Sequence, residues 1–331
     1  MKKHSLPFTL LAGLLALSLN SSTAFSQSAF PNKAITLIVP TAPGGPIDMT
    51  ARIVAKDLST ELGQPIVVMN RPGGSQKIGV ESLLSSPKDG YTFAAVSPAS
   101  MTINPVIEKS VGYDPLKDFT YLANAIEYQS VLVVHPSIAV KNLAEFIAYA
   151  KANPTKLSYG SGGNGSSMQF TTSTFLNLTN IEALQITYKS SGPAMLGLLG
   201  GEVNMLMPDL GDIRQYVTNG SVIALAVTGS ERNKRLPNVP TFPETGIPEL
   251  KNWTYTGWIG FVASAGIPVE AAQRLQNALQ VTLKTDKMKE AFDGIGFKVI
   301  ATVPSEFKKQ IAEGLESNKK VVKAMGLKPA S

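Results

Sequence analysis

Short apolar runs rich in β-branched residues alternate along this chain with longer stretches that have helical patterns. Such runs predict β-strands, and the stretches between them predict α-helices. The predicted strands are Ile35–Val39, Ile66–Met69, Thr92–Val96, Val131–His135, Leu157–Tyr159, Leu184–Tyr188, Val203–Met207, Ile223–Val227, Trp258–Ala263 and Lys298–Ile300. The predicted helices include Asp48–Leu62, Leu143–Ala152, Ser167–Leu176, Pro193–Leu199, Ile213–Thr218, Pro268–Leu283 and Pro304–Lys323. Strands that alternate with helices at this spacing indicate an α/β protein with parallel sheets covered on both faces.

The first 26 residues have the pattern of an export signal. Lys2 and Lys3 precede an apolar segment, Leu6–Leu19, which is too short to span a bilayer comfortably. Ala24-Phe25-Ser26 forms a small-x-small cleavage site, so we expect cleavage near Ser26 and a mature chain that begins at Gln27. No cysteine lies near this site, which argues against a lipoprotein anchor. We therefore expect an exported, periplasmic protein.

The expected mature chain of about 305 residues is large for a single core and suits two domains. No low-complexity linker separates two parts of the sequence, so we expect two lobes joined by strands that cross between them. The expected crossings are Val131–His135 and the region around Trp253. The first lobe would then comprise residues 27–130 plus 254–331, and the second lobe residues 131–253.

The amino-acid composition limits the reactive groups and the kinds of ligand that this protein can use. The chain has no cysteine, which removes disulfides, thiol nucleophiles and thiolate metal sites. The formal net charge is +6, and it falls to +4 when Lys2 and Lys3 leave with the signal. A modest positive field favours anionic ligands. Nucleic acid is not expected as a partner, because no dense cluster of Lys and Arg with interleaved aromatic residues is present.

A loop rich in glycine and proline follows the first predicted strand and leads into a helix. Its residues are Thr41, Ala42, Pro43, Gly44, Gly45, Pro46, Ile47 and Asp48. Glycines let backbone N–H groups approach a ligand closely, and a helix N-terminus favours negative charge. The loop is therefore a candidate site for a carboxylate. Asp48 has two possible roles, ligand contact or capping of the helix that follows.

Motifs farther along the chain resemble those of the TctC family, also called the Bug family. These proteins are the substrate-binding components of tripartite tricarboxylate transporters. The resemblance covers essentially the whole expected mature chain, in the order of the family. The segments that carry it are Leu62–Gly74, Pro87–Phe93, Ile103–Pro105, Tyr113–Phe119, Tyr159–Ser166, Tyr188-Lys189, Pro193-Ala194, Gly200–Val203, Ala224–Thr228, Pro237–Thr241 and Gly257–Phe261.

The resemblance implies a type II periplasmic-binding-protein fold, in which two α/β lobes with mixed, mostly parallel sheets close on a ligand. It also implies a carboxylate ligand held by two facing loops, and delivery to a membrane permease. No metal or cofactor is implied, and a monomer is expected. The candidate ligand-binding residues are Thr41, Ala42, Pro43, Gly44, Gly45, Pro46, Ile47 and Asp48, then Ser97, then Ser161, Gly162, Gly163, Asn164, Gly165 and Ser166, and finally Asp209.

Departures from the family pattern bear on the ligand. Thr41 replaces the usual aromatic residue before the first glycine segment, and Gln169 replaces a frequent histidine. The aromatic-Asp pair of the family is replaced by Met207-Pro208, with Asp209 one place later. In relatives that bind amino acids, an acidic group here is expected to meet the amine. Its displacement favours aliphatic di- and tricarboxylates or aromatic carboxylates over amino acids.

Enzyme functions are less well supported than binding. Gly160–Gly165 matches G-x-G-x-x-G, but the next predicted strand ends at Thr187-Tyr188-Lys189, without the acidic residue of a dinucleotide site. His135 is the only histidine after the expected signal, no G-x-S-x-G elbow is present, and no metal-binding cluster stands out. Lys189 could face a distal carboxylate or solvent, whereas Trp253 and Trp258 are expected in the core or hinge. A sensor that feeds a signalling partner remains the alternative to transport.

Overall fold

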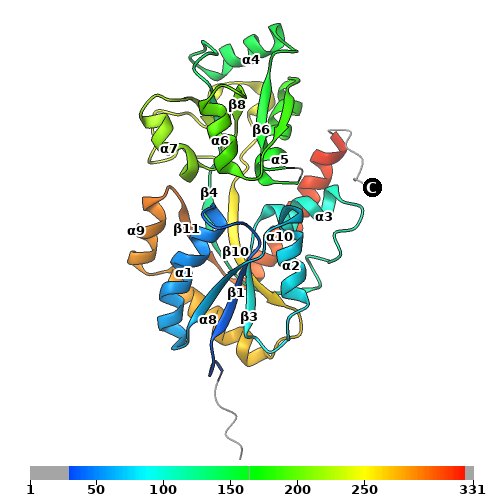
Figure 1. Cartoon of the computed structure of the whole chain (residues 1–331), viewed down its shortest axis with the longest axis vertical. Helices are drawn as coiled ribbons and strands as arrows, with labels where there is room; N and C mark the ends of the chain where they lie inside the picture. Colours follow the sequence, from blue (N-terminus) through cyan, green and yellow to red (C-terminus); the bar gives the residue numbers. More distant parts are fainter. Residues whose placement is uncertain (1–29, 164, 325–331) are drawn as a thin grey trace, which may run out of the picture.

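The computed structural model describes residues 30–163 and 165–324, which form two mixed β-sheets with helices on both faces (Figure 1). The first sheet contains six strands in the order β11-β4-β10-β3-β1-β2. These strands are β1 (Ile35–Val39), β2 (Ile66–Asn70), β3 (Thr92–Val96), β4 (Phe119–Tyr128), β10 (Gly257–Ser264) and β11 (Lys298–Thr302). The second sheet contains five strands in the order β7-β6-β8-β5-β9. These strands are β5 (Val131–Val134), β6 (Ser158–Ser161), β7 (Leu184–Thr187), β8 (Met205–Leu206) and β9 (Ile223–Val227).

Buried apolar clusters fix the helices on both faces of each sheet. One cluster joins the first sheet to α1, α8 and α9, and a second joins its other face to α2 and α10. In the second sheet, α4 and α5 pack on one face, and α6 and α7 on the other. The helices are α1 (Pro46–Leu62), α2 (Lys77–Leu84), α3 (Asn104–Ile107), α4 (Leu143–Ala152), α5 (Ser167–Thr179), α6 (Ser191–Leu199), α7 (Leu210–Thr218), α8 (Val269–Leu283), α9 (Asp286–Gly294) and α10 (Pro304–Ala324). Each sheet with its helices is called a lobe below.

The sheets are mixed rather than purely parallel. β1 pairs in parallel with β2 and β3, and β6 pairs in parallel with β7 and β8. The pairings that involve β5 or β10, and the pairing of β11 with β4, are antiparallel. The expectation of parallel sheets from strand–helix alternation therefore holds only for these two groups of three strands. β4, the longest strand of the first sheet, was not among the predicted elements.

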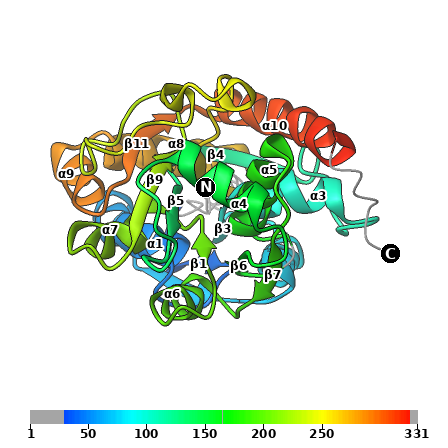
Figure 2. The ribbon, with the colours of Figure 1, turned by 90° about the horizontal axis from the view of Figure 1, so that it is seen from above.

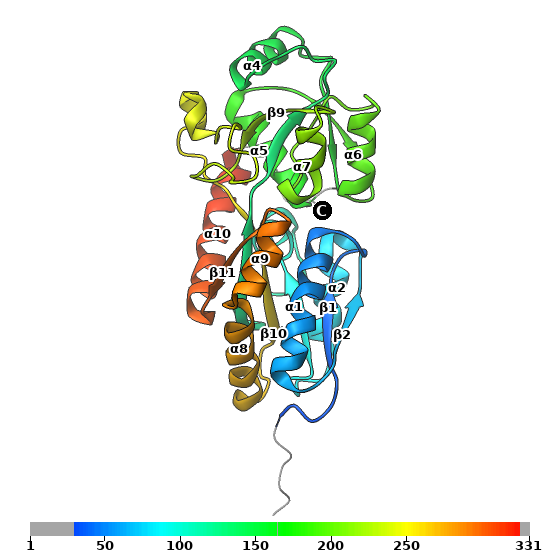
Figure 3. The same ribbon diagram turned by 90° about the vertical axis from the view of Figure 1, so that its left-hand side faces the viewer.

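Two short connections carry the chain between the lobes. Residues 129–130 join β4 to β5, and residues 254–256 lead back to β10. The first connection is tied to the second lobe, because the amide of Gln129 donates to the carbonyl oxygen of Thr228 at 2.6 Å and Ser130 N donates to Thr228 Oγ1 at 2.9 Å. Figure 3 shows α10 extending from the first lobe to the level of the second. Among the described residues, no helix has the length and apolar character needed to cross a membrane.

The lobes meet on two sides of these connections (Figures 1 and 2). On one side α7 approaches α9, and a Cβ atom added to Gly211 would lie 3.0 Å from the carbonyl oxygen of Ile295. On the other side Phe170 of α5 packs with Ile103 and with Val322 of α10. The arrangement brings the carboxyl ends of β1 and β3 toward those of β6 and β8, where open α/β sheets usually bind ligands.

Candidate functional site

The first glycine loop joins the carboxyl end of β1 to the N-terminus of α1. Gly44 has φ +92°, a conformation that glycine adopts at low cost, and Gly45 is the N-cap residue of α1. A Cβ atom added to either glycine would have no neighbour within 4 Å. Ala42, Pro43 and Gly44 are exposed. The loop thus presents open backbone at a helix N-terminus, which is a favourable place for an anion.

Asp48 holds this loop in place. Its Oδ2 atom accepts hydrogen bonds from Gly44 N at 2.9 Å and from Arg52 Nε at 3.0 Å, and its Oδ1 atom accepts one from Asn70 Nδ2 at 2.8 Å. Burial opposes ionisation, but the hydrogen bonds from Arg52, Gly44 and Asn70 outweigh it and lower the pKa of Asp48. Asn70 Nδ2 also donates to the carbonyl oxygen of Thr41. Both carboxylate oxygens are engaged by the protein, which favours a positioning role.

The second glycine loop joins the carboxyl end of β6 to the N-terminus of α5. Ser166 is the N-cap residue, and its hydroxyl accepts from Gln169 N at 3.2 Å and donates to the carbonyl oxygen of Gly163 at 2.7 Å. Ser161 Oγ accepts from Gly163 N at 3.3 Å, so a serine fixes each end of the loop. Asn164, another candidate residue, lies outside the described residues.

Gly165 brings the second loop against the first lobe. Its φ is +78°, and a Cβ atom there would collide with the side-chain oxygen of Asn104, which is fully buried. Gly163 is different, because a Cβ atom there would meet only Thr187, at 3.9 Å. Gly162 would meet only Ser166, within its own loop. Gly165 therefore makes the close contact between lobes, while Gly162 and Gly163 leave room in front of the loop.

Ser97, the candidate residue at the end of β3, is buried and bonded to a residue that the sequence did not single out. Its hydroxyl donates to Gln76 Oε1 at 2.9 Å. Gln76 follows the Gly73-Gly74 turn after β2, and the side-chain amide of Asn104 donates to the carbonyl oxygen of the adjacent Ser75 at 2.7 Å. The glycine turn after a strand was a visible signal, but the position of the Gln76 side chain was not.

Asp209 lies at the N-terminus of α7, where its backbone forms an isolated bridge with Ser130. Burial, followed by the charge of Asp212, raises the pKa of Asp209 well above its usual value. Burial also raises the pKa values of Asp212, Tyr128 and Tyr255, and Asp209 adds to the shift of each tyrosine. Asp209 thus belongs to a cluster with Asp212, with Tyr128 at the end of β4 and with Tyr255 of the return connection, and sequence reasoning missed those three partners.

Several buried polar atoms in this region have no hydrogen-bond partner among the described residues. They are Thr41 Oγ1, Asn104 Oδ1, Asp212 Oδ2 and Tyr255 OH. Buried polar groups in proteins are nearly always paired, with water or a ligand where protein cannot serve. These atoms come from both lobes and from a connection between them. Five further unpaired atoms among the described residues lie within the first lobe, so these four show only that unsatisfied polar groups are also present where the lobes meet.

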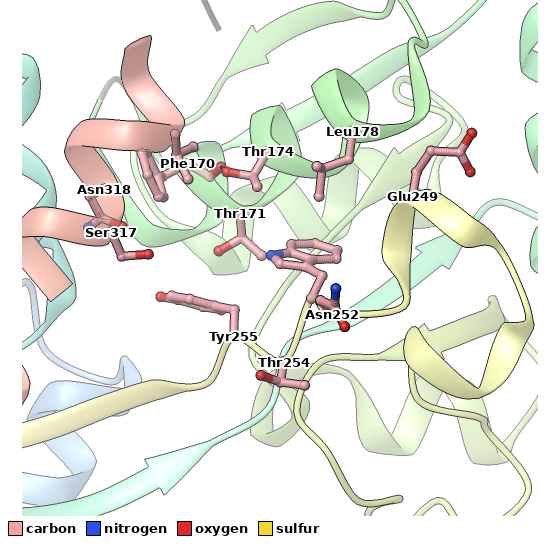
Figure 4. Close-up of a pocket in the computed structure, with 12 residues that line it drawn as sticks. Phe170, Thr171, Thr174, Leu178, Glu249, Asn252, Thr254, Tyr255, Ser317 and Asn318 are labelled. Atoms are coloured by element: carbon pink, nitrogen blue, oxygen red, sulfur yellow. Dashed lines mark hydrogen bonds between the residues drawn. The ribbon is translucent and has the colours of Figure 1, made fainter. Parts of the chain in front are cut away.

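A cavity among the described residues lies elsewhere, beside the return connection. It has a volume of about 410 Å³ and lies between α5, residues 249–255 and α10. Thr171 and Tyr255 project into it from opposite sides (Figure 4). Its lining includes none of the candidate ligand-binding residues. Trp253 lines this cavity and packs on Phe242, with ring centroids 4.6 Å apart, whereas Trp258 is buried in the first lobe.

Residues that carried enzyme hypotheses are not brought together. His135 Nδ1 lies 2.8 Å from Ser137 Oγ on an exposed turn, and no carboxylate is bonded to the ring among the described residues. Within residues 30–163 and 165–324, no group of three His, Asp or Glu side chains could hold a metal ion. Lys189 is exposed, and the neighbouring Tyr188 hydroxyl donates to Glu202. The described geometry therefore offers donors for binding rather than a nucleophile with its base.

The sequence is similar to curated bacterial proteins over nearly its full length. It is 32% identical over 296 residues to a protein from the tcbD–tcbE intergenic region of Pseudomonas sp. strain P51, which covers 89% of this chain and 87% of the relative. It is 30% identical over 317 residues to the protein BugT of Bordetella pertussis, which covers 96% of each chain.

Solved structures share the fold. A periplasmic transporter is 34% identical with a TM-score of 0.84, covering 91% of this chain and 100% of that chain. R. palustris Rpa4515, solved with adipate, is 30% identical with a TM-score of 0.85 and the same coverage. MatC from Rhodopseudomonas palustris, solved with bound malate, is 25% identical with a TM-score of 0.81, covering 88% of this chain and 100% of that chain. The fold is therefore that of the periplasmic binding proteins, as expected.

The sequence profile described as "Tripartite tricarboxylate transporter family receptor" matches residues 50–327. The match covers most of the chain, including α1 from residue 50 onward, both connections between lobes and the second glycine loop. It agrees with the resemblance found from the sequence motifs and with the binding-protein fold. The chain belongs to the tripartite tricarboxylate transporter receptor family, whose members are solute-binding proteins also known as TctC or Bug proteins.

Proposed function

We propose that this protein captures a small organic carboxylate between its lobes in the periplasm and delivers it to a tripartite tricarboxylate-type membrane permease. The chain is exported by residues 1–26, and the signal is cleaved near Ser26. The lobes comprise residues 27–130 with 254–331 and residues 131–253. Closure of one lobe on the other retains the ligand, which is released unchanged.

The observation that carries this proposal is the pair of glycine loops on opposite lobes. Each loop joins the carboxyl end of a parallel strand to the N-terminus of a helix. Gly44, Gly45 and Gly163 leave open space where side chains would stand. Backbone N–H groups in such loops can bond both oxygens of a carboxylate, and the helix dipoles of α1 and α5 favour its charge. Asp48 and Ser166 keep the two loops in shape.

The proposed ligands are aliphatic di- or tricarboxylates or aromatic carboxylates. Two similar structures were solved with aliphatic dicarboxylates, adipate in Rpa4515 and malate in MatC. Thr41 has a hydroxyl without a hydrogen-bond partner among the described residues, which suits an oxygen-rich ligand. The formal charge expected after signal removal is positive, which also favours acids.

A thermal-shift screen of the mature protein tests the proposal. The panel contains citrate, succinate, malate, adipate, benzoate, nicotinate and glutamate. An acid present at one hundred times its Kd stabilises the folded protein by about 2.7 kcal/mol. We expect a clear rise of Tm with one subset of acids. If every acid leaves Tm unchanged and calorimetry detects no binding at millimolar concentration, the proposal is wrong.

Two matched valine variants locate the site. Gly45 has φ −83° and open space around it, so Gly45→Val should fold while placing a side chain in the proposed ligand space. Gly294→Val is the control, because Gly294 also has open space but lies at the end of α9. We expect loss of at least about 90% of the affinity in Gly45→Val and unchanged affinity in the control. Equal affinity in both variants would place the ligand elsewhere.

A further inference from the structure

The segment that follows β2 has an unusual backbone. Gly73, Gly74, Ser75 and Gln76 have φ values of +129°, +53°, +47° and +83° in succession. Glycine adopts such conformations readily, but Ser75 and Gln76 carry side chains that disfavour them. Residues held in this way persist only where surrounding contacts fix them, and they concentrate at functional sites. Gln76 also immediately precedes the first residue of α2.

Contacts on three sides place Gln76 at the proposed site. Its Oε1 atom accepts from Ser97 Oγ, at the end of β3. Gly79, three residues later, packs directly on Pro40, at the start of the first glycine loop. The carbonyl oxygen of Ser75 accepts from Asn104, which in turn contacts Gly165 of the second lobe. Gln76 therefore lies between the ends of β1 and β3, on the edge that faces the second lobe.

The side chain of Gln76 is oriented by its bond to Ser97. The residue is only 9% exposed, and Ser97 only 1%. A carboxamide has an oxygen acceptor and two N–H donors. Ser97 engages the oxygen, whereas Nε2 has no hydrogen-bond acceptor among the described residues. The arrangement therefore leaves a fixed, uncharged donor at the edge where the lobes meet.

We propose that Gln76 selects the ligand by donating a hydrogen bond from Nε2 to a second oxygen-bearing group of the bound acid. This inference rests on the proposed function, in which the glycine loops take the first carboxylate. Neighbouring strands are about 4.8 Å apart, so a donor beside β3 suits a group a few bonds away from a carboxylate held beyond β1. The preferred ligands are dicarboxylates and hydroxy acids, and unsubstituted monocarboxylates of equal length bind weakly.

The selectivity follows from the chemistry of an unpaired donor. A site built to hydrogen-bond a polar group rejects an analogue that lacks it, because a donor that the bound ligand shuts off from water then remains unsatisfied. Because the amide is neutral, its N–H group can donate to a hydroxyl oxygen as well as to a carboxylate oxygen. A ligand amine or amide nitrogen would instead place a donor against a donor. Gln76 thus favours oxygen acceptors irrespective of charge.

The test compares matched acids by calorimetry, adipate with hexanoate and succinate with butyrate. Wild type should bind each dicarboxylate at least about tenfold more tightly than its partner acid. Gln76→Met keeps the side-chain length but removes the donor. In this variant, the ratio of the affinity for each dicarboxylate to the affinity for the matched monocarboxylate should fall to within about threefold of one. Gln76→Gly suits the positive φ and should give the same ratios, which guards against a folding defect of the methionine variant.

Gln276→Met on α8 is the control, because the amide of Gln276 donates to the carbonyl oxygen of Tyr121, away from the glycine loops. It should keep the wild-type ratios. Wild-type ratios in both Gln76 variants would overturn the role of Gln76 while leaving the proposed function intact. If wild type binds none of the four acids and none of the wider panel, the proposed function itself fails, and the inference falls with it.

Discussion

The guanidinium of Arg235 donates to the carboxylate of Asp293 at 3.0 Å, and this ion pair joins the two lobes. Arg235 follows β9 in the second lobe, whereas Asp293 lies on α9 in the first. The pair stands beside the contact of Gly211 with Ile295. It is partly exposed to solvent and exists only while the lobes are together. The pair should therefore stabilise the closed arrangement relative to an open one.

Arg235→Ala should weaken binding of the cognate acid by about 1.4-fold to fivefold, because exposed ion pairs contribute roughly 0.2–1 kcal/mol. The effect should shrink at high salt. Calorimetry gives the affinity, and X-ray scattering of the ligand-free protein should give a larger radius of gyration than wild type. Lys33→Ala is the control, since Lys33 pairs with Asp89 inside the first lobe. Wild-type affinity of Arg235→Ala at low salt would exclude this role.

Gly165→Ala should prevent full closure. The added methyl group would collide with the side chain of Asn104, so affinity should fall at least about tenfold. Gly220→Ala provides a matched control, because Gly220 has nearly the same φ, +76° against +78°, but open space around it. Both variants should lose similar stability from the positive φ. Equal affinities of the two variants would show that Gly165 is needed only for the conformation of its own turn and not for closure of the lobes.

Ser166→Ala should lose both stability and affinity. Removal of a serine N-cap typically costs about 1 kcal/mol, and here it also frees the carbonyl oxygen of Gly163. Thr285→Ala removes the N-cap of α9, outside the glycine loops, and should lose comparable stability without loss of affinity. Chemical denaturation and calorimetry on both variants measure the two effects. An unchanged Kd in Ser166→Ala would show that this loop does not take part in ligand binding.

Asp209→Asn should stabilise the ligand-free protein at neutral pH. Burial and Asp212 raise the folded-state pKa of Asp209 above 3.8, so the folded protein holds this proton more tightly than the unfolded chain. The resulting stability is complete below pH 3.8 and is lost as pH rises through the raised pKa. Asparagine cannot lose a proton, so the Tm of the variant should exceed that of wild type by about 2–4 °C at pH 7.

The Tm difference should vanish toward pH 4. Asp286→Asn serves as a control, because hydrogen bonding from Lys289 lowers the pKa of Asp286 instead, and its removal should give no gain at pH 7. If Asp209→Asn is no more stable than wild type at any pH between 4 and 8, Asp209 does not carry an unfavourable charge in the folded protein.

Much of the fold was predictable because alternation and turn residues reflect local chemistry. The predicted Ile35–Val39 and Thr92–Val96 coincide with β1 and β3, and Leu143–Ala152 coincides with α4. β4 was missed because residues 119–128 are almost entirely buried, so no alternation of apolar and polar positions marks this central strand. α9 was missed because it is short and largely charged, and packing decides its structure more than pattern does.

Only the parts of the site that are formed by backbone groups were predictable from the sequence. The two glycine loops could be identified from sequence because the glycines and the following helices are local features. The contact of Gly165 with Asn104 depends on how the lobes meet, which no local pattern encodes. The bond between Gln76 and Ser97 joins loops after different strands and depends on the left-handed conformation of Gln76. Side-chain placement of this kind is a property of tertiary structure.

The strand order of the first sheet has a consequence for biogenesis. β10 lies between β3 and β4, although it follows them by more than 120 residues. A chain that emerges from its N-terminus can complete the five-stranded sheet once β9 has appeared, but the six-stranded sheet must wait for residues 257–302. Until then β3 and β4 expose unpaired edges, which are prone to aggregation. The unfinished lobe is therefore the part of the nascent protein that most needs a chaperone.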